Sequence, residues 1–452
     1  MRRPRIKPEH EPYPVSDTTV RIGGGVEGIA AEITEPGGWL WSLIRAADGT
    51  ATPDTIVRRV RRAHPKAPAA EVRAALNALI DGGYAEDAAA AVPPDLSAAE
   101  QERYDRGMRW FRWADLTPRA SRWDVQRRLR AARVTLIGLG GTGGAAALAL
   151  AGTGVGALHC VDADEVSLSN LNRQVLYTTA DVGRPKAEAA LDRLRLVNPD
   201  ITITAEERLI ASAADLARAS AGSSLLVLCA DEPAELRLWA NRVCLAARRP
   251  WVDSGYYGPL VTAGAYVPGH GPCWECLRAA ERARLGMPET APAGLVGELH
   301  RVPGHPATAI TAGLSGQFAA HLAVALLTGV PPVAPARYGG QPDAGGPAGA
   351  DLGPPPARLP GPRPDGPENP RLTRPVLLVA NALVPVPCDP YSHRRERRED
   401  GGGRCAFYRP GGTPRCPIPT RPWESATPSA QTSAGTGTAT KTPPTLARGC
   451  WP

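Results

Sequence analysis

A glycine-rich run and an isolated lysine carry the clearest chemical signal in this chain. Gly138, Gly140, Gly141 and Gly143 follow the apolar stretch 133–137 and precede the alanine-rich stretch 145–150. Glycines there permit positive φ angles and a close backbone approach, so the first amides of the new helix can face an anion. Lys186 is the only lysine between Lys66 and Lys441, in a chain that otherwise draws its positive charge from arginine. The pattern predicts a strand, a tight turn and a helix that bind phosphate groups together with Lys186.

The next apolar stretch, residues 157–161, ends in an acid. Asp162 stands at its tip, and Asp164 follows two residues later. An acid at the end of the second strand of such a unit suits a ribose hydroxyl. We therefore expect Asp162 to bind ribose and Asp164 to position the loop or a metal ion. A simple strand-end cap is the alternative for Asp162.

Polar side chains beyond these acids separate a triphosphate site from a dinucleotide site. Asn170, Arg173 and Gln174 come first, and the segment Gly183–Lys186 follows. A dehydrogenase binds one pyrophosphate with helix amides, whereas a nucleoside triphosphate that loses pyrophosphate needs cations on its β- and γ-oxygens. We expect Arg173 and Lys186 to supply that charge, and Asn170 and Gln174 to orient phosphates. Gln174 as a residue that only pins the loop is the alternative.

Asp231 is the candidate metal ligand. It ends the apolar run 225–230, at the carboxyl edge of a predicted parallel sheet, where ligands bind. One carboxylate there can hold Mg²⁺ against phosphates. The competing interpretation is an N-cap for a helix that begins near Pro233, and the two roles are compatible.

From Val134 to about Cys276, the chain resembles the ThiF/MoeB, ubiquitin-activating-enzyme-like adenylyltransferase family. Five ordered motifs carry the resemblance: Gly138–Gly143, Asp162-Ala-Asp164, Ser169-Asn170-x-x-Arg173-Gln174, Gly183-x-Pro185-Lys186 and Cys229-Ala-Asp231. Residues 230–233, Asn241, Asp253-Ser-Gly-Tyr256 and residues 266–276 make it most similar to the microcin C type of peptide adenylyltransferase. The resemblance implies a Rossmann-like α/β fold with a mainly parallel sheet, ATP and Mg²⁺ as cofactors, and activation of a C-terminal carboxylate.

The resemblance also implies a homodimer. Family members carry Arg-Tyr-x-Arg-Gln ahead of the glycine loop, and the second arginine reaches the triphosphate of the neighbouring subunit. Arg106 falls on that position, although Gly107 replaces the glutamine. A solvated helix face, with arginines paired to Glu100 and Glu102, is the alternative.

The first 92 residues are predicted to form a separate domain. Two short strands around a glycine turn, within residues 18–33, precede three helical stretches at 38–45, 52–62 and 69–82. This pattern resembles the winged-helix, PqqD-like modules that bind leader peptides as an added strand on a sheet edge. A dimerisation or packing domain is the alternative.

Cys273 and Cys276 have the spacing of half a tetrahedral Zn²⁺ site. A second Cys-x-x-Cys is missing from the sequence; only Cys388, Cys405, Cys416 and Cys450 follow. Either the pair binds no metal or distant cysteines complete an irregular structural site.

Composition narrows the class of protein. The net charge is +7, yet the basic residues are scattered and only 5% of residues are aromatic, so no nucleic-acid platform is expected. We find neither a signal peptide nor a stretch close to a membrane span, and expect a cytoplasmic protein. Residues 93–335 would form the adenylation domain, and residues 336–452, rich in proline, glycine, serine and threonine, a largely disordered tail.

The function predicted from these features is ATP-dependent adenylylation of the C-terminal carboxylate of a ribosomally made precursor peptide, in natural-product biosynthesis. Three alternatives stay open. One is activation of a ubiquitin-like sulfur-carrier protein. Another is a non-catalytic leader-binding partner of a cyclodehydratase. The last is a dinucleotide oxidoreductase.

Overall fold

The computed structural model describes residues 1–26, 28–284 and 306–340 of the chain. Its amino-terminal elements are, in order, β1 (Pro4–Ile6), β2 (Tyr13–Pro14), β3 (Thr19–Ile22), β4 (Ala31–Thr34), α1 (Leu40–Ala46), α2 (Pro53–Ala63), α3 (Ala69–Asp81) and β5 (Ala85–Asp87). The remaining elements are α4 (Ala98–Ala114), α5 (Asp124–Ala131), β6 (Arg133–Ile137), α6 (Gly141–Thr153), β7 (Ala157–Asp162), α7 (Lys186–Val197), β8 (Thr202–Glu207), α8 (Ala213–Ala219), β9 (Leu225–Leu228), α9 (Leu236–Ala246), β10 (Trp251–Tyr257), β11 (Leu260–Tyr266), α10 (Trp274–Arg284), α12 (Ala309–Thr328) and β12 (Ala336–Gly340).

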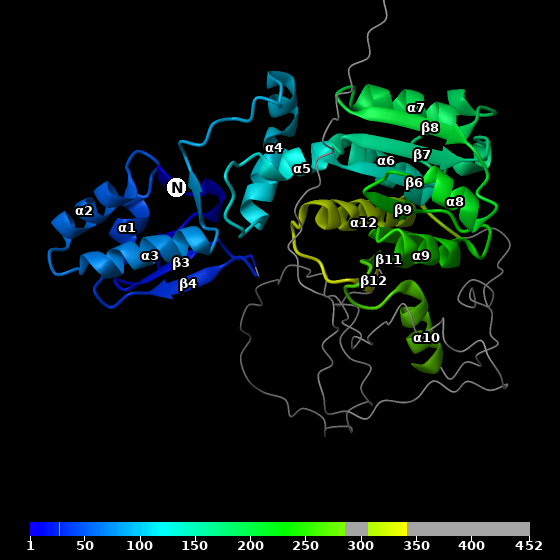
Figure 1. The fold of residues 1–452 in the computed structure, drawn as a ribbon. Coiled ribbons are helices and arrows are strands. Elements are labelled where there is room, and N and C mark those ends of the chain that lie inside the picture. Colours follow the sequence, from blue (N-terminus) through cyan, green and yellow to red (C-terminus); the bar gives the residue numbers. More distant parts are fainter. Residues whose placement is uncertain (27, 285–305, 341–452) are drawn as a thin grey trace, which may run out of the picture. The chain divides into compact units, whose positions relative to one another are not determined.

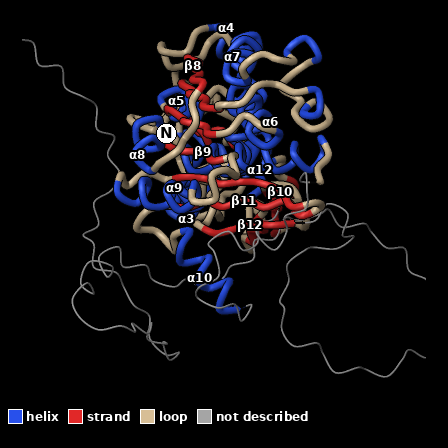
Figure 2. Tube along the Cα trace, turned by 90° about the vertical axis from the view of Figure 1, so that its right-hand side faces the viewer, coloured by secondary structure: helices blue, strands red, loops and turns tan. Residues whose placement is uncertain are grey.

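A seven-stranded sheet organises the second group of elements, in the order β12-β11-β10-β9-β6-β7-β8. The strands from β8 to β10 are parallel, whereas β11 and β12 are antiparallel additions at one edge. Figure 1 shows these strands following one another from β8 at the top to β12 at the bottom, and Figure 2 shows the same succession from the side. The predicted Rossmann-like α/β fold with a mainly parallel sheet is confirmed.

Helices cover both faces of this sheet. One apolar core joins the sheet to α5, α6, α7 and α12, and another joins it to α8, α9 and α10. The central strand β9, Leu-Leu-Val-Leu, is buried throughout, as a strand covered on both faces must be. Strand order reverses at β6, whose neighbours β7 and β9 come from opposite halves of the fold. The crevice at that point is the place where open α/β sheets bind ligands.

Small residues bring α12 and α6 close together. A Cβ on Gly316 would lie 2.3 Å from the carbonyl oxygen of Thr142, so only glycine fits at this crossing. Beside it, the hydroxyls of Thr142 and Ser315 are 2.6 Å apart and share a hydrogen bond. The contact holds α6, and with it the preceding loop, against the sheet.

Two expectations about the carboxyl-terminal half are corrected. α12 is long and apolar enough, by length and composition alone, to cross a membrane, although we expected no such stretch. It packs against α6, β10 and β11, so its apolar composition serves a protein core. The sheet also extends beyond residue 335, because β12 pairs with β11 from Ala336 to Gly340. The expected tail from residue 341 onward lies outside the described residues.

The amino-terminal elements have a core of their own. β2, β3 and β4 form an antiparallel sheet, and α1, α2 and α3 pack around Leu43, Ile56 and Leu76. The two strands and three helices predicted from the pattern are confirmed. The pairing of β1 with β5 was not predicted, because three-residue strands some eighty positions apart leave no periodic signal.

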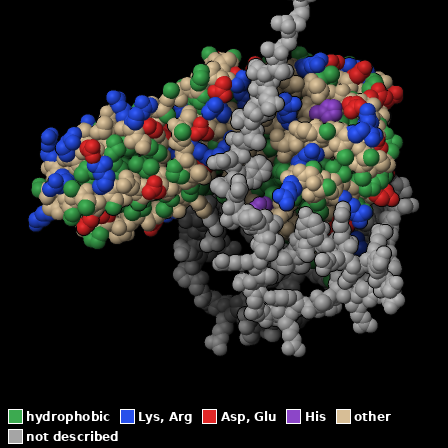
Figure 3. All heavy atoms as spheres, in the orientation of Figure 1, with side chains coloured by type: hydrophobic (Ala, Val, Ile, Leu, Met, Phe, Trp, Pro, Cys, Tyr) green, Lys and Arg blue, Asp and Glu red, His purple; other side chains and the backbone are tan. Residues whose placement is uncertain are grey.

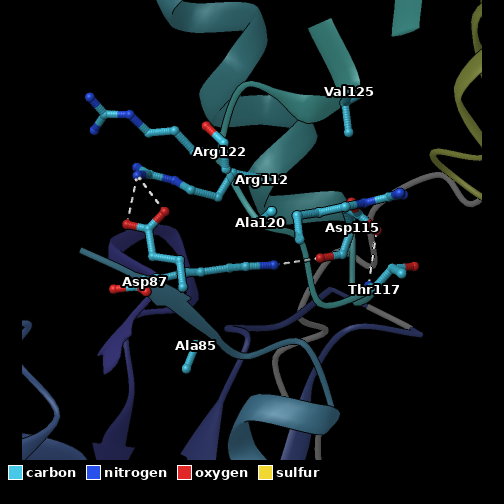
Figure 4. A pocket seen from close by; sticks show the side chains of 12 residues that line it. Ala85, Asp87, Arg112, Asp115, Thr117, Ala120, Arg122 and Val125 are labelled. Carbon is cyan, nitrogen blue, oxygen red and sulfur yellow. Dashed lines mark hydrogen bonds and ion pairs between the residues drawn. The ribbon is translucent and has the colours of Figure 1, made fainter. Parts of the chain in front are cut away.

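Charged side chains join β1 and β5 to the carboxyl end of α4. Arg112 pairs with Glu86, at 3.1 Å, and with Glu9. Lys7 donates through Nζ to the carbonyl oxygen of Asp115 at 2.5 Å. Figure 4 shows Arg112 and Asp115 in the small pocket that also contains Ala85 and Asp87. The carboxyl end of α4 is thereby capped by the ammonium of Lys7, which directly follows β1.

Candidate active site

The glycine run forms a tight loop between β6 and α6. Gly138 has φ +90°, and a Cβ there would lie 2.8 Å from the backbone nitrogen of Ala230 in the segment after β9. A Cβ on Gly143 would lie 1.7 Å from the carbonyl oxygen of Gly138. Glycine is therefore required at both positions, and the first-turn amides of α6 open at the reversal point of the sheet.

Asp162 ends β7 and supports this loop directly. Its Oδ2 accepts a hydrogen bond from the amide of Leu139 at 2.5 Å, and its Oδ1 accepts from the amide of Asp164 at 2.9 Å. Burial raises the pKa of this carboxyl, while Lys186 and the two amides oppose the rise. Asp162 thus lies at the predicted place, and part of its hydrogen-bonding capacity is used by the loop.

Lys186 opens α7 and points to the same rim. Its Nζ lies 2.7 Å from Oδ2 of Asp164, and its backbone amide donates to the carbonyl oxygen of Asp164 at 2.8 Å. The hydroxyl of buried Tyr177 donates to the carbonyl oxygen of Leu139 at 3.0 Å, which fixes the loop from behind. The amino end of α7 and the glycine loop are therefore held as one unit.

Arg173 and Gln174 follow a short 3₁₀ turn and lie against the glycine loop. A Cβ on Gly141 would lie 3.0 Å from the carbonyl oxygen of Arg173, and one on Gly140 would lie 3.9 Å from Nε2 of Gln174. Gln174 is buried, and its Oε1 has no hydrogen-bond partner among the described residues. An unpaired polar atom beside an open loop indicates a site that a ligand or water completes.

Asn170 has a local role in the same turn. Its Oδ1 accepts from the amide of Ser167 at 3.1 Å, and this closes the turn that presents Arg173. The guanidinium of Arg173 donates to the carbonyl oxygen of Ser169 and to Oδ1 of Asn172, both at 3.0 Å. Burial raises the pKa of Tyr256 at the end of β10, the charge of Arg173 lowers it, and the charge of Asp231 raises it.

Asp231 follows β9 with an exposed side chain, 67% accessible. Its Oδ1 lies 2.9 Å from NH2 of Arg237, and its Oδ2 has no hydrogen-bond partner among the described residues. Mg²⁺ commonly binds proteins through one or two carboxylates plus substrate phosphates and water. An exposed carboxylate with a free oxygen beside the glycine loop fits that need. The alternative role of Asp231 as an N-cap is not realised, since Glu235 occupies the N-cap position of α9 and makes no side-chain cap.

Two groups of predicted residues do not join this site in the described chain. Arg106 is exposed on α4 and forms no ion pair or hydrogen bond through its side chain among the described residues. Glu100, its alternative partner, pairs with Arg130 at 2.9 Å. Cys273 and Cys276 lie at the start of α10 with their sulfurs 3.5 Å apart. Cys276 is disulfide-bonded, whereas Zn²⁺ binds cysteine as a thiolate. No set of three His, Cys, Asp or Glu ligands occurs among the described residues, so the Zn²⁺ site is incomplete there.

The surface offers no concentrated basic platform on the face drawn in Figure 3, where lysine and arginine are interspersed with acids and apolar groups. His321 is exposed on α12, and its ring lies edge-on to Trp110 of α4, with ring centroids 6.4 Å apart. It lies apart from the loop and takes no role in the site.

Sequence reasoning missed Arg237. It links Asp231 to the buried Asp253, whose Oδ2 lies 3.2 Å from its Nε. Arginines are frequent in this chain, and nothing in the spacing distinguishes this one. The acid-rich context of residues 231–235 was the only available signal.

Comparison with known proteins assigns the domain. The ThiF family profile matches residues 111–343. Molybdopterin-synthase adenylyltransferase of Escherichia coli K12 is 40% identical over 185 residues, which cover 40% of this chain and 70% of that protein. Sulfur carrier protein ThiS adenylyltransferase of the same organism is 41% identical over 158 residues, covering 34% of this chain and 61% of that protein.

Solved structures match a longer part of the chain. A crystal structure of E. coli MccB with ATP aligns with a TM-score of 0.58 at 22% identity, over 74% of this chain and 93% of that one. A structure of PaaA aligns with a TM-score of 0.56 at 21% identity, over 74% of this chain and 96% of that one. At such identities, the likeness establishes the shared fold.

Proposed function

Because the chain belongs to the ThiF family and is an ATP-dependent adenylyltransferase, we propose that it adenylylates the C-terminal carboxylate of a ribosomally made peptide. The observation that carries this proposal is the convergence of Lys186, Arg173 and Asp231 around one glycine loop. Lys186 reaches the loop through Asp164 and Asp162. Arg173 lies against Gly141 of the loop, and Asp231 directly follows Ala230, which lies against Gly138. The first-turn amides of α6 are thus surrounded by cations suited to a leaving polyphosphate and by a carboxylate suited to a metal ion.

In this reaction, a carboxylate oxygen of the substrate attacks the α-phosphorus of ATP. The bond from that phosphorus to the oxygen that bridges to the β-phosphate breaks, and pyrophosphate leaves with the electron pair. The substrate carboxylate is already ionised, so no proton has to move. Arg173 and Lys186 stabilise the charge on departing pyrophosphate, and Asp162 orients the ribose. Mg²⁺, held by Asp231, would supply further neutralisation of phosphate charge.

The peptide substrate is favoured by the chain's architecture. Solved structures of MccB, including one with AMPCPP and MccA, align with about three quarters of this chain and so include elements before the ThiF match. The amino-terminal domain, for which we keep the boundaries 1–92, offers β4 as an edge strand. β4 pairs only with β3 among the described residues, and its backbone is open to an added strand.

A homodimer is part of the proposal. Trp110 on α4 and Ile310 and Leu314 on α12 are large apolar side chains exposed on the surface. A second copy would cover such residues and would bring Arg106 near a neighbouring triphosphate. Arg106 then acts across the subunit interface, which accounts for its lack of a partner among the described residues of one chain.

Activation of a small sulfur-carrier protein is the second candidate. It is favoured by the 40% identity to molybdopterin-synthase adenylyltransferase, which exceeds the identity to the MccB structures. The two candidates share the same adenylylation chemistry and differ in the molecule that presents the carboxylate.

Substrate-dependent exchange of labelled pyrophosphate into ATP tests the proposal. We expect exchange with a pool of synthetic peptides that have free carboxyl termini, and none with the same pool after amidation. Exchange only with a carrier protein that ends in Gly-Gly would select the second candidate. ATP binding without any exchange would favour a scaffold, and tight NAD or FAD binding without ATP binding would reject adenylylation.

Hydrogen exchange of the full-length protein tests the peptide-binding domain separately. A bound peptide that extends the small sheet should protect the amides of residues 31–34. Protection confined to the adenylation domain would remove the clamp from the proposal and leave the chemistry intact.

A further inference from the structure

We propose that Arg237 is a positioning residue, which fixes the carboxylate of Asp231 toward the metal-bound triphosphate by tying it to the buried Asp253. This inference rests on the proposed adenylylation site. Arg237 lies in the first turn of α9 and uses two different nitrogens. Its NH2 lies 2.9 Å from Oδ1 of Asp231, and its Nε lies 3.2 Å from Oδ2 of Asp253.

The two carboxylates have very different environments. The Asp231 side chain is 67% exposed, whereas that of Asp253 is 6% exposed on the central part of β10. Tyr266 on β11 donates its hydroxyl to Oδ1 of Asp253 at 3.1 Å, and it stacks on Trp251 with ring centroids 4.4 Å apart. Asp253 is therefore rigidly held. It anchors the guanidinium of Arg237, which in turn reaches the exposed side chain of Asp231 at the rim.

The backbone around this cluster leaves room for it. Gly264 stands directly opposite Asp253 in the antiparallel pair of β10 and β11. A Cβ on Gly264 would lie 2.2 Å from the hydroxyl oxygen of Tyr266 and 2.5 Å from Oδ1 of Asp253. No other residue could occupy that position without displacing the hydrogen bond. The space is thus reserved for the Asp253–Tyr266 pair.

Charge counting shows why the three ionic groups act together. Two carboxylates share one guanidinium, so these three groups together carry one net negative charge. Without Arg237, the buried carboxylate of Asp253 would lose its ion pair of 3.2 Å, and Asp231 would lose its fixed direction. Without the charge of Asp253, Arg237 would neutralise Asp231 one to one, and the rim would attract a divalent cation less.

A planar guanidinium is specifically needed here. Arginine can donate to two acceptors in fixed directions, whereas the lysine ammonium is a single point charge on a flexible chain. Lysine at position 237 would keep the charge but could not hold both carboxylates in the same geometry. Arg237→Lys is therefore the sharpest variant, because the balance of charge is unchanged.

Binding of Mn²⁺ measured by electron paramagnetic resonance tests this role without turnover. The probe is the full-length protein with the non-hydrolysable analogue AMPCPP. We expect Arg237→Lys and Asp253→Asn each to weaken Mn²⁺ in this complex about tenfold, and to leave metal-free nucleotide binding within about twofold. The double variant Arg237→Lys/Asp231→Asn should bind Mn²⁺ no more weakly than Asp231→Asn alone, because Arg237 acts through Asp231.

Arg242→Ala is the matched control, since Arg242 is an exposed arginine of the same helix, paired with Glu275 at 3.3 Å. It should bind Mn²⁺ like the wild type. If Arg237→Lys also binds Mn²⁺ like the wild type, or if its effect simply adds to that of Asp231→Asn, the positioning role is wrong. Wild-type protein that binds Mn²⁺ and AMPCPP but shows no pyrophosphate exchange would refute the proposed function and leave this inference standing.

Discussion

Lys186 and Asp164 form an ion pair of 2.7 Å in which one side chain is buried and the other is not. The lysine side chain is 6% exposed and that of the aspartate is 71% exposed. The ammonium of Lys186 is therefore directed from inside the fold toward the rim of the candidate site, where it pairs with the exposed carboxylate of Asp164. A polyphosphate would compete with Asp164 for the ammonium of Lys186. The proposed triphosphate would therefore meet a cation that is already held in position.

Removal of this cation should abolish pyrophosphate exchange. We expect Lys186→Ala to lower exchange by about 10²–10³-fold, the usual effect of losing one charge-stabilising donor. Lys66→Ala, at an exposed lysine between α2 and α3, is the matched control and should leave exchange unchanged. Exchange by Lys186→Ala within a few-fold of the wild type would contradict the assignment.

The glycine loop can be tested with two substitutions at the start and end of one helix. Gly143→Ala would place a methyl group 1.7 Å from the carbonyl oxygen of Gly138. We expect it to destabilise the fold by about 2–3 kcal/mol and to abolish ATP binding. Gly152→Ala, near the other end of α6, meets no atom within 4 Å and should stabilise the helix by up to about 1 kcal/mol. Calorimetric titration measures ATP binding, and thermal melting measures the stability of each variant. Equal ATP affinity and equal stability of the two variants would exclude the steric argument.

Local sequence signals were sufficient to predict the geometry of the glycine loop and its neighbours in the candidate site. Gly138, Gly143, Asp162 and Lys186 lie at turns and helix starts, where residue type and spacing directly constrain the backbone. The structure places all four at one rim. The expected strand, loop and helix follow from the same short stretch, and so does the parallel sheet that contains them.

The acidic half required the three-dimensional register. Arg237 reaches Asp253 because β10 lies beside β9, and Asp253 keeps its place because Gly264 faces it across the β10–β11 pair. These relations join residues that are not neighbours in any helical or strand period, so pattern analysis could not find them. The same limit applies to β12, whose residues 336–340 look like the start of a proline- and glycine-rich tail.

Arg106 allows a direct test of a site shared between subunits. We expect Arg106→Ala to lower exchange by about 10²-fold or more, as for other arginines that stabilise leaving phosphates. A mixture of Arg106→Ala and Lys186→Ala proteins should recover part of the activity, because a mixed dimer contains one intact site. Arg109→Ala, an exposed arginine of the same helix paired with Asp105 at 3.0 Å, is the control. Absence of recovery in verified mixed dimers would place Arg106 outside the partner's site.

Lys7 predicts a pH dependence of stability at the end of α4. Burial lowers the pKa of this lysine from 10.5 to about 8, and the charges of Asp115 and Glu86 only partly oppose the shift. Between these values the unfolded chain binds more protons than the folded one, so this group's contribution to stability rises with pH. The charged form of Lys7 lowers the free energy of unfolding most below pH 8, and this penalty disappears as the pH approaches 10.5.

From pH 7 to pH 9.5, the free energy of unfolding of the wild type should rise by about 2 kcal/mol relative to Lys7→Met, which lacks the titrating group. Thermal melts of both proteins at matched pH measure the difference, with Lys66→Met as the exposed control, which should follow the wild type. A constant difference between wild type and Lys7→Met across this range would show that Lys7 titrates normally, and that its bond to the Asp115 carbonyl compensates fully for burial.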